Sequence, residues 1–147
     1  MNTRETMKAL NELLVQVETS YLTIAKENGL TYNGLMMLLM VEYYEHLTQK
    51  QVCNALYLPK SSVHSLLADF IKRGYLTLIE GGNTKEKYII PTPLGEKFIQ
   101  KVSRETETIE NGTIEVISAE EMSQFIRTAE TLADRMTRET YKIYGRK

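Results

Sequence analysis

The sequence predicts a mainly α-helical protein with one small β hairpin. Apolar residues recur every three or four positions through most of the 147 residues, which is helical spacing. Residues 75–91 are instead β-branched and aromatic around Gly81-Gly82-Asn83, which is typical of a two-stranded hairpin. Before this hairpin, two short helical segments flank Tyr57-Leu58-Pro59, where proline disfavours helix at the preceding residue and so predicts a turn.

The composition is that of a globular protein, with 42% hydrophobic and 25% charged residues. No window approaches 18 consecutive apolar residues, and the first residues form a polar amphipathic stretch rather than a signal peptide. A single cysteine permits no intramolecular disulfide, which fits a reducing compartment. We expect a cytoplasmic protein without a membrane partner.

The first two predicted helices differ in polarity. Residues 5–27 have a regular apolar stripe, and Asn28-Gly29 ends the helix. Thr31 then caps a second helix that is apolar nearly all round. Such helices are usually buried, so residues 35–41 are predicted to form the centre of the domain.

The next two helices have the outline of a helix-turn-helix. Thr48 and Gln51 form a capping box that opens a short helix with Val52, Cys53 and Leu56 facing inward. The second helix runs from about residue 60 to residue 73 and ends before Gly74. Its inner face is predicted to hold Val63, Leu66, Leu67, Phe70 and Ile71.

Two long helices complete the chain after Pro91 closes the hairpin. Thr92-Pro93 is a helix start, and that helix is expected to reach Asn111-Gly112. Ser118 opens the last helix in a second capping box. The apolar face of that helix comprises Met122, Phe125, Ile126, Ala129, Leu132, Ala133, Met136 and Ile143. A helix-turn-helix followed by a hairpin is a winged helix.

Charge is unevenly distributed along the chain. The net charge is −1, yet residues 48–100 carry seven basic and four acidic side chains, a net +3 that leaves −4 for the remainder. This central segment is therefore the candidate for contact with phosphates.

In the order and spacing of its pieces, the chain resembles the MarR (multiple-antibiotic-resistance regulator) family of bacterial transcription factors. The resemblance is carried by Leu47-Thr48, Lys60-Ser61-Ser62-Val63, Gly74-Tyr75-Leu76 and Thr92-Pro93-Leu94-Gly95. It implies a winged-helix DNA-binding lobe in residues 31–91 and dimerisation helices in residues 1–28 and 93–147. The implied partners are double-stranded DNA and a second copy of the chain.

Three parts of the winged helix are predicted to contact DNA. They are the cap of the first helix of the helix-turn-helix, the first turns of its second helix, and the hairpin. The candidate residues are Thr48, Lys60, Ser61, Ser62, His64, Ser65, Asn83, Lys85 and Lys87. A structural alternative stands beside each group: Ser61 and Ser62 would cap the helix, and Lys85 and Lys87 would protect a strand edge from pairing.

The chain departs from the family pattern at two places. Asn83-Thr84-Lys85 stands where the family usually has Asp-x-Arg at the tip of the wing, and lysine lacks the planar fork of arginine. His64-Ser65 stands where a Thr-Arg pair is common, which removes a bidentate contact to guanine. Weaker reading of the minor groove is expected.

The resemblance also implies a small-molecule effector, whose identity and site stay unknown. Candidate cleft residues, which helical spacing equally places in the core, are Tyr21, Tyr32, Met36, Met40, Tyr43 and Tyr44. Cys53 is interpreted as an inert core thiol, with a redox sensor as the alternative. No histidine or cysteine pair has metal-ligand spacing, so neither a metal nor another cofactor is expected. No phosphate loop or nucleophile–base pair predicts an enzyme.

Both ends of the chain carry apolar stripes that a small central lobe cannot cover. We therefore expect a homodimer whose two lobes bind a pseudo-palindromic operator. The predicted function is that of an effector-responsive repressor. The alternative is a dimeric winged-helix protein-interaction module that has lost specific DNA binding.

Overall fold

A computed structural model of the chain describes residues 1–82 and 85–146. The predicted contact residue Asn83 lies outside the described residues. The described part forms six helices and one two-stranded antiparallel sheet, which confirms the predicted mainly α-helical fold with a small hairpin. In chain order the elements are α1 (Thr3–Glu27), α2 (Tyr32–Tyr43), α3 (Gln49–Leu56), α4 (Lys60–Lys72), β1 (Leu76–Glu80), β2 (Lys87–Pro91), α5 (Pro93–Ile114) and α6 (Ala119–Tyr144).

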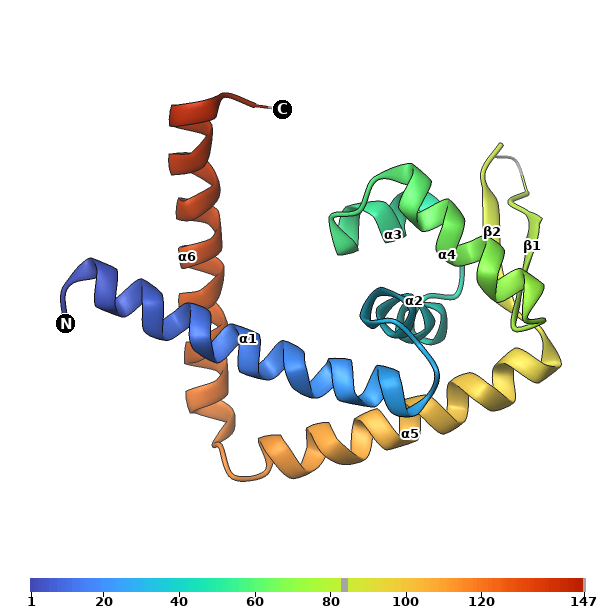
Figure 1. The fold of residues 1–147 in the computed structure, drawn as a ribbon, viewed down its shortest axis with the longest axis horizontal. Helices are drawn as coiled ribbons and strands as arrows, with labels where there is room; N and C mark the ends of the chain where they lie inside the picture. Colours follow the sequence, from blue (N-terminus) through green and yellow to red (C-terminus); the bar gives the residue numbers. More distant parts are fainter. Residues whose placement is uncertain (83–84, 147) are drawn as a thin grey trace. The chain divides into compact units, whose positions relative to one another are not determined.

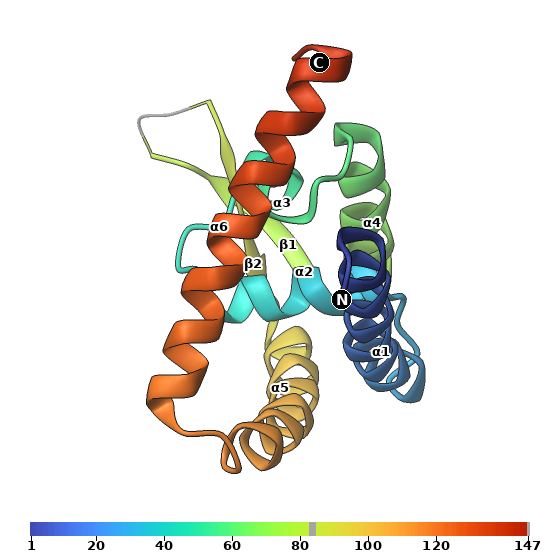
Figure 2. The same ribbon diagram turned by 90° about the vertical axis from the view of Figure 1, so that its left-hand side faces the viewer.

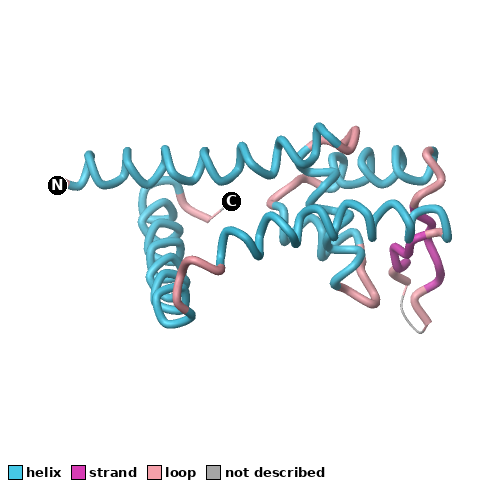
Figure 3. The backbone as a smooth tube through the Cα atoms, turned by 90° about the horizontal axis from the view of Figure 1, so that it is seen from below, coloured by secondary structure: helices cyan, strands magenta, loops and turns pink. Residues whose placement is uncertain are grey.

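The chain divides into two compact units, Met1–Thr106 and Glu107–Lys147. The first unit holds α1 to α4, the hairpin and most of α5. The second unit holds the last turns of α5 and the whole of α6. Figure 3 shows how far helices dominate the chain, with the two strands in magenta.

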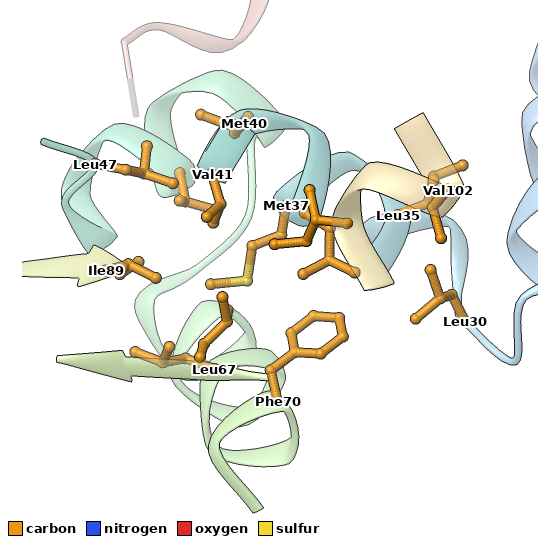
Figure 4. Close-up of a cluster of buried hydrophobic side chains, with 14 of the residues drawn as sticks. Leu30, Leu35, Met37, Met40, Val41, Leu47, Leu67, Phe70, Ile89 and Val102 are labelled. Carbon is orange, nitrogen blue, oxygen red and sulfur yellow. The ribbon is translucent and has the colours of Figure 1, made fainter. Parts of the chain in front are cut away.

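Helix α2 is the centre of the first unit. Figure 1 shows it end-on, with α3 and α4 on one side and α1 and α5 on the other. Leu35, Met37 and Leu38 are fully buried, as the sequence predicted for this segment. Phe70 of α4 packs into the same core (Figure 4). A Cβ at Gly34 would lie 3.3 Å from the Phe70 ring, so glycine there permits the close approach of α2 and α4.

The helix starts are set by local side-chain bonds that the sequence predicted. The Thr31 hydroxyl accepts a hydrogen bond from the Gly34 N–H at 3.0 Å. Thr48 and Ser118 each complete a capping box, with Gln51 and Glu121 respectively. Each box satisfies amide donors that the first helical turn leaves without a partner, and so fixes where its helix begins.

The hairpin is tied to the lobe through its second strand. The strands pair from Leu76 with Pro91 to Glu80 with Lys87. The Ile89 N–H also donates to the Leu47 carbonyl at 2.8 Å, which extends the sheet by one bridge just before α3. Figure 2 shows the hairpin projecting from the lobe as a wing.

The start of α5 is fastened to the junction between α4 and β1. The Thr92 N–H donates to the Tyr75 carbonyl at 3.0 Å, and the Gly95 N–H donates to the Thr92 hydroxyl at 3.0 Å. The ring of Tyr75 stacks on Phe98, with centroids 4.4 Å apart. The predicted helix start at Thr92-Pro93 therefore also joins α5 to the lobe.

Three details differ from the sequence-based expectations. Helix α5 continues through Gly112 to Ile114, because the backbone there stays helical and glycine permits a stop without requiring one. Ile71 is 42% exposed, since it lies to the side of the face formed by Val63, Leu67 and Phe70. Cys53 packs against the core as expected, but it is only half-buried and also lines a groove.

Candidate nucleic-acid interface

Helix α4 buries one face and exposes the other, as expected. Val63, Leu67 and Phe70 are buried, whereas His64 and Ser65 are exposed. The exposed face also includes Ser61, Ala68 and Lys72, and the last two were not among the predicted contacts. Ala68 and Lys72 follow Ser61 and Ser65 at helical spacing, so the sequence could have placed them on the same exposed face.

Proline, rather than serine, stands at the cap of α4. Pro59 is the N-cap residue, and no described side chain makes a capping bond there. The alternative interpretation of Ser61 and Ser62 as caps is therefore wrong, because both lie inside the first turn. Ser61 is exposed and Ser62 is half-buried. Their DNA contacts stay predictions.

A groove of about 590 Å³ lies between the start of α3, the start of α4 and the hairpin. We call it the lysine groove. It brings together four of the predicted residues, Thr48, Lys60, Lys85 and Lys87, with others that the sequence did not single out. Its lining comprises Thr48, Gln49, Lys50, Cys53, Lys60, Lys85, Glu86 and Lys87.

Thr48 acts in this groove as a structural residue. It is only 8% exposed, and its hydroxyl accepts from the Gln51 N–H at 3.2 Å while its own N–H donates to the Gln51 side chain at 2.9 Å. These bonds hold the first turn of α3 and so position Gln49 and Lys50 along the groove. A direct contact between Thr48 and DNA stays a prediction.

Ser62 and Ser65 line a second groove, of about 510 Å³, between α4 and the start of α2. Its apolar lining includes Leu58 and Phe70, and its polar rim includes Arg73. Arg73 is bound to Asp69 at 3.0 Å and donates to the Gly29 carbonyl at 3.2 Å. Arg73 therefore joins the end of α4 to the turn between α1 and α2.

Lys50 is the basic residue of the lysine groove that the sequence-based contact set omitted. The capping box at Thr48 gave the start of α3, so Lys50 could be placed in its first turn. The position of Lys50 opposite the hairpin could not be predicted, because it depends on the pairing of Leu47 with Ile89. Long-range strand pairing brings the two segments together, and local sequence does not encode it.

Residues 1–82 and 85–146 hold neither a metal-binding cluster nor a membrane-spanning helix. These residues contain no cluster of three histidine, cysteine or acidic side chains that would hold a metal ion. Among the same residues, no helix combines the length and the apolar character that crossing a membrane requires.

Comparisons with known proteins point to one family. Residues 28–85 match the model of the MarR family. The fold is similar to that of a MarR family regulator from Neisseria meningitidis, with a TM-score of 0.82, 16% identity, and coverage of 97% of this chain and 99% of that one. A comparison with curated protein sequences finds no match.

Two other similar structures were solved with bound molecules. A putative MarR family transcriptional regulator from Listeria monocytogenes is complexed with a 26mer DNA, with a TM-score of 0.74, 15% identity, and coverage of 96% of this chain and 95% of that one. Staphylococcus aureus MarR is in complex with salicylate and kanamycin, with a TM-score of 0.73, 14% identity, and coverage of 93% of each chain. The family match over residues 28–85 and this shared fold together show a winged-helix chain that is similar to MarR family regulators.

Proposed function

We propose that the protein is a homodimeric transcriptional regulator that represses from a pseudo-palindromic operator and releases the DNA when a small molecule binds. The observation that carries the proposal is the exposed polar face of α4 beside the lysine groove. A helix that offers small polar side chains at its first turns suits the major groove of DNA, while neighbouring lysines suit the phosphates. The similar Listeria structure with bound DNA supports this use of the fold.

Two-fold pairing is supported by the terminal helices. Leu13, Leu14 and Val17 of α1 are more than half exposed. Helix α6 is amphipathic over 26 residues, yet none of those residues, all of them described, is buried in the single chain. A long amphipathic helix gains its stability by covering its apolar face, and a second copy of the chain would supply that cover.

Release by an effector would act through the spacing of the two lobes. A ligand that favours one spacing of the recognition helices shifts the population away from the state that fits successive turns of DNA. The complex of S. aureus MarR with salicylate and kanamycin supports a small molecule as the signal.

A fluorescence anisotropy titration with a duplex from upstream of the protein's own gene tests the proposal. We expect the protein to prefer this duplex over a scrambled duplex of equal length and composition. His64→Ala and Ser65→Ala should each reduce that preference about 10-fold, because a lost base contact costs roughly 1–3 kcal/mol. Binding to the scrambled duplex should stay unchanged.

Ser123→Ala is the matched control, since Ser123 is an exposed serine on α6. It should behave like the wild type with both duplexes. A wild-type protein that binds neither duplex would contradict the proposal and favour the dimeric protein-interaction module instead.

A further inference from the structure

The turn between α1 and α2, Asn28-Gly29, is bound from two sides. The Arg73 guanidinium at the end of α4 donates to the Gly29 carbonyl at 3.2 Å. On the other side, the Asn28 side chain donates to Glu105 of α5 at 2.9 Å and accepts from Lys101 of α5 at 2.7 Å. We call these bonds together the turn contact. They connect the end of α4 to the middle of α5.

The turn is held in one conformation by the last turn of α1. The Gly29 N–H donates to the Lys26 carbonyl at 3.1 Å, and the Leu30 N–H donates to the Ala25 carbonyl at 2.8 Å. Gly29 has a φ of 68°, the left-handed backbone with which glycine commonly ends a helix. Ala25 and Leu30 are both buried in the core. A displacement of the turn would therefore move the end of α1 with it.

A separate contact fastens the start of α5 to the junction after α4. The Thr92 N–H donates to the Tyr75 carbonyl, and the Tyr75 ring stacks on Phe98. One such contact alone lets two helices pivot about it. Lys101 and Glu105 bind the turn roughly 15 Å further along α5, since a helix rises about 1.5 Å per residue. Two contacts at this separation fix the angle between α4 and α5.

We propose that Arg73 is a positioning residue that fixes the angle of α4 to α5 through the Asn28-Gly29 turn, and thereby the half-site spacing that the paired lobes accept. The inference rests on the proposed function, in which α4 enters the major groove. Helix α5 leads along the chain to α6, whose apolar face the proposed function assigns to the second copy. The angle of α4 to α5 would then decide how each recognition helix is presented to the DNA.

Arginine suits this position because it makes two bonds in different directions. Its Nε lies 3.0 Å from Asp69 of the same helix, while a terminal nitrogen reaches the Gly29 carbonyl. The planar guanidinium holds its donors in fixed directions, whereas lysine has one compact ammonium. Asp69 therefore orients the guanidinium toward the turn. The Arg73 side chain is 41% exposed, so these bonds add little to stability and act mainly on orientation.

Distances between spin labels test the turn contact without DNA. Ala68→Cys on α4 and Gln100→Cys on α5 replace exposed residues, and Cys53→Ser removes the natural thiol. Mixing with excess unlabelled protein restricts the measurement to one chain. Double electron–electron resonance should give a narrow distance distribution with Arg73 present and a broader one with Arg73→Gln. Lys26→Gln, which removes a positive charge from the last turn of α1 and keeps the turn contact, should leave the distribution narrow.

Duplexes with altered half-site spacing test the consequence for recognition. Anisotropy titrations compare the upstream duplex with versions that carry one base pair more or one fewer between the half-sites. The wild type should discriminate against both altered versions, and Arg73→Gln should narrow that discrimination at least about 5-fold. The slope of log affinity against log salt should stay that of the wild type, because Arg73 neutralises no phosphate. Lys26→Gln should match the wild type in both measurements.

The outcomes separate this inference from the proposed function. Unchanged label distances or unchanged spacing discrimination in Arg73→Gln would overturn the inference and leave the proposed function standing. A salt slope shallower by about 1 would make Arg73 a phosphate contact and also overturn it. If the wild type binds no DNA, the proposed function and the effect on half-site spacing both fall, and the label distances alone decide whether the turn contact fixes α4.

Circular dichroism confirms that each variant is folded.

Discussion

Gly95 lets the start of α5 pack against the backbone of Tyr75. A Cβ at this position would lie 1.8 Å from the Tyr75 carbonyl oxygen, far inside van der Waals contact. The sequence predicted a helix start at Thr92-Pro93-Leu94-Gly95. It did not reveal why glycine is needed, because the contact is made by a segment about twenty residues away.

Gly95→Ala should lower the free energy of unfolding by about 3 kcal/mol, since either α5 or the α4–β1 junction must move. Gly112→Ala is a matched control in the same helix, because nothing lies within 4 Å of its Cβ position. The control should raise the stability by about 0.5–1 kcal/mol through the better helix propensity of alanine. Urea denaturation at one protein concentration measures both. Equal effects of the two substitutions would contradict the packing of Gly95 against Tyr75.

Glu105 links α5 to the end of α1. Its carboxylate accepts from the Asn28 side chain at 2.9 Å and lies 2.9 Å from the Lys101 ammonium. The bond from Asn28, followed by that from Lys101, holds the pKa of Glu105 below its ordinary value. Because the folded-state pKa is lowered, this group stabilises the fold above about pH 4.5, and the contribution is lost as the pH falls further.

Glu105→Gln should therefore show a smaller fall in its urea midpoint between about pH 7 and pH 3 than the wild type. Glu107→Gln removes a carboxylate from the same helix and controls for net charge. A Glu105→Gln profile that overlays the wild-type profile would show that the bonds to Asn28 and Lys101 do not contribute.

At the scale of elements, the sequence predicted the helices and the hairpin because their signals are local. Capping boxes at Thr48 and Ser118 and the Asn28-Gly29 stop all depend on neighbours within four residues. The end of α5 was missed because Gly112 is compatible with either a stop or continuation. The sequence did not predict the lysine groove, because residues from three separate segments form it. Nothing in the residues next to Lys50 indicates that it lies near Lys60 and the hairpin lysines.

The predicted turn between α3 and α4 contains a residue whose backbone conformation the sequence did not predict. Tyr57 adopts a left-handed conformation, with φ of 52° and ψ of 41°, and its side chain is 94% exposed. Left-handed backbone costs an ordinary residue roughly 1 kcal/mol, and asparagine tolerates it better. No burial of the ring compensates for that cost.

Tyr57→Asn should raise the free energy of unfolding by about 0.5–1 kcal/mol, measured by urea denaturation. Tyr43→Asn is the control, because Tyr43 is also exposed but lies in right-handed helix. That control should be neutral or slightly destabilising. Destabilisation by Tyr57→Asn would mean that the tyrosine side chain contributes to the turn despite its exposure.

At the scale of the whole molecule, the apolar face of α6 is the feature that a single chain leaves without cover. Phe125 is 61% exposed, and Ile126 and Met136 are at least half exposed. The sequence predicted this face from its helical spacing, and it predicted a second copy of the chain as the cover. Which residues meet across a dimer interface depends on the partner and cannot be read from one chain.

Phe125→Glu should weaken the dimer at least 100-fold, because a charge would be buried among apolar side chains. Sedimentation equilibrium over a range of concentrations measures the dissociation constant. Thr131→Glu adds the same charge on the polar face of α6 and should leave the dimer intact. A wild-type protein that stays monomeric at high concentration would remove the basis for two paired lobes.

Hydroxyl-radical footprinting on the upstream duplex shows whether two paired lobes bind the DNA, because it reports the number and spacing of the protected segments. Two recognition helices related by two-fold symmetry should protect two segments on one face of the duplex, with centres about one helical turn, or ~34 Å, apart. A single protected segment, or uniform cleavage with the protein present at saturating concentration, would contradict a dimer of DNA-binding winged helices.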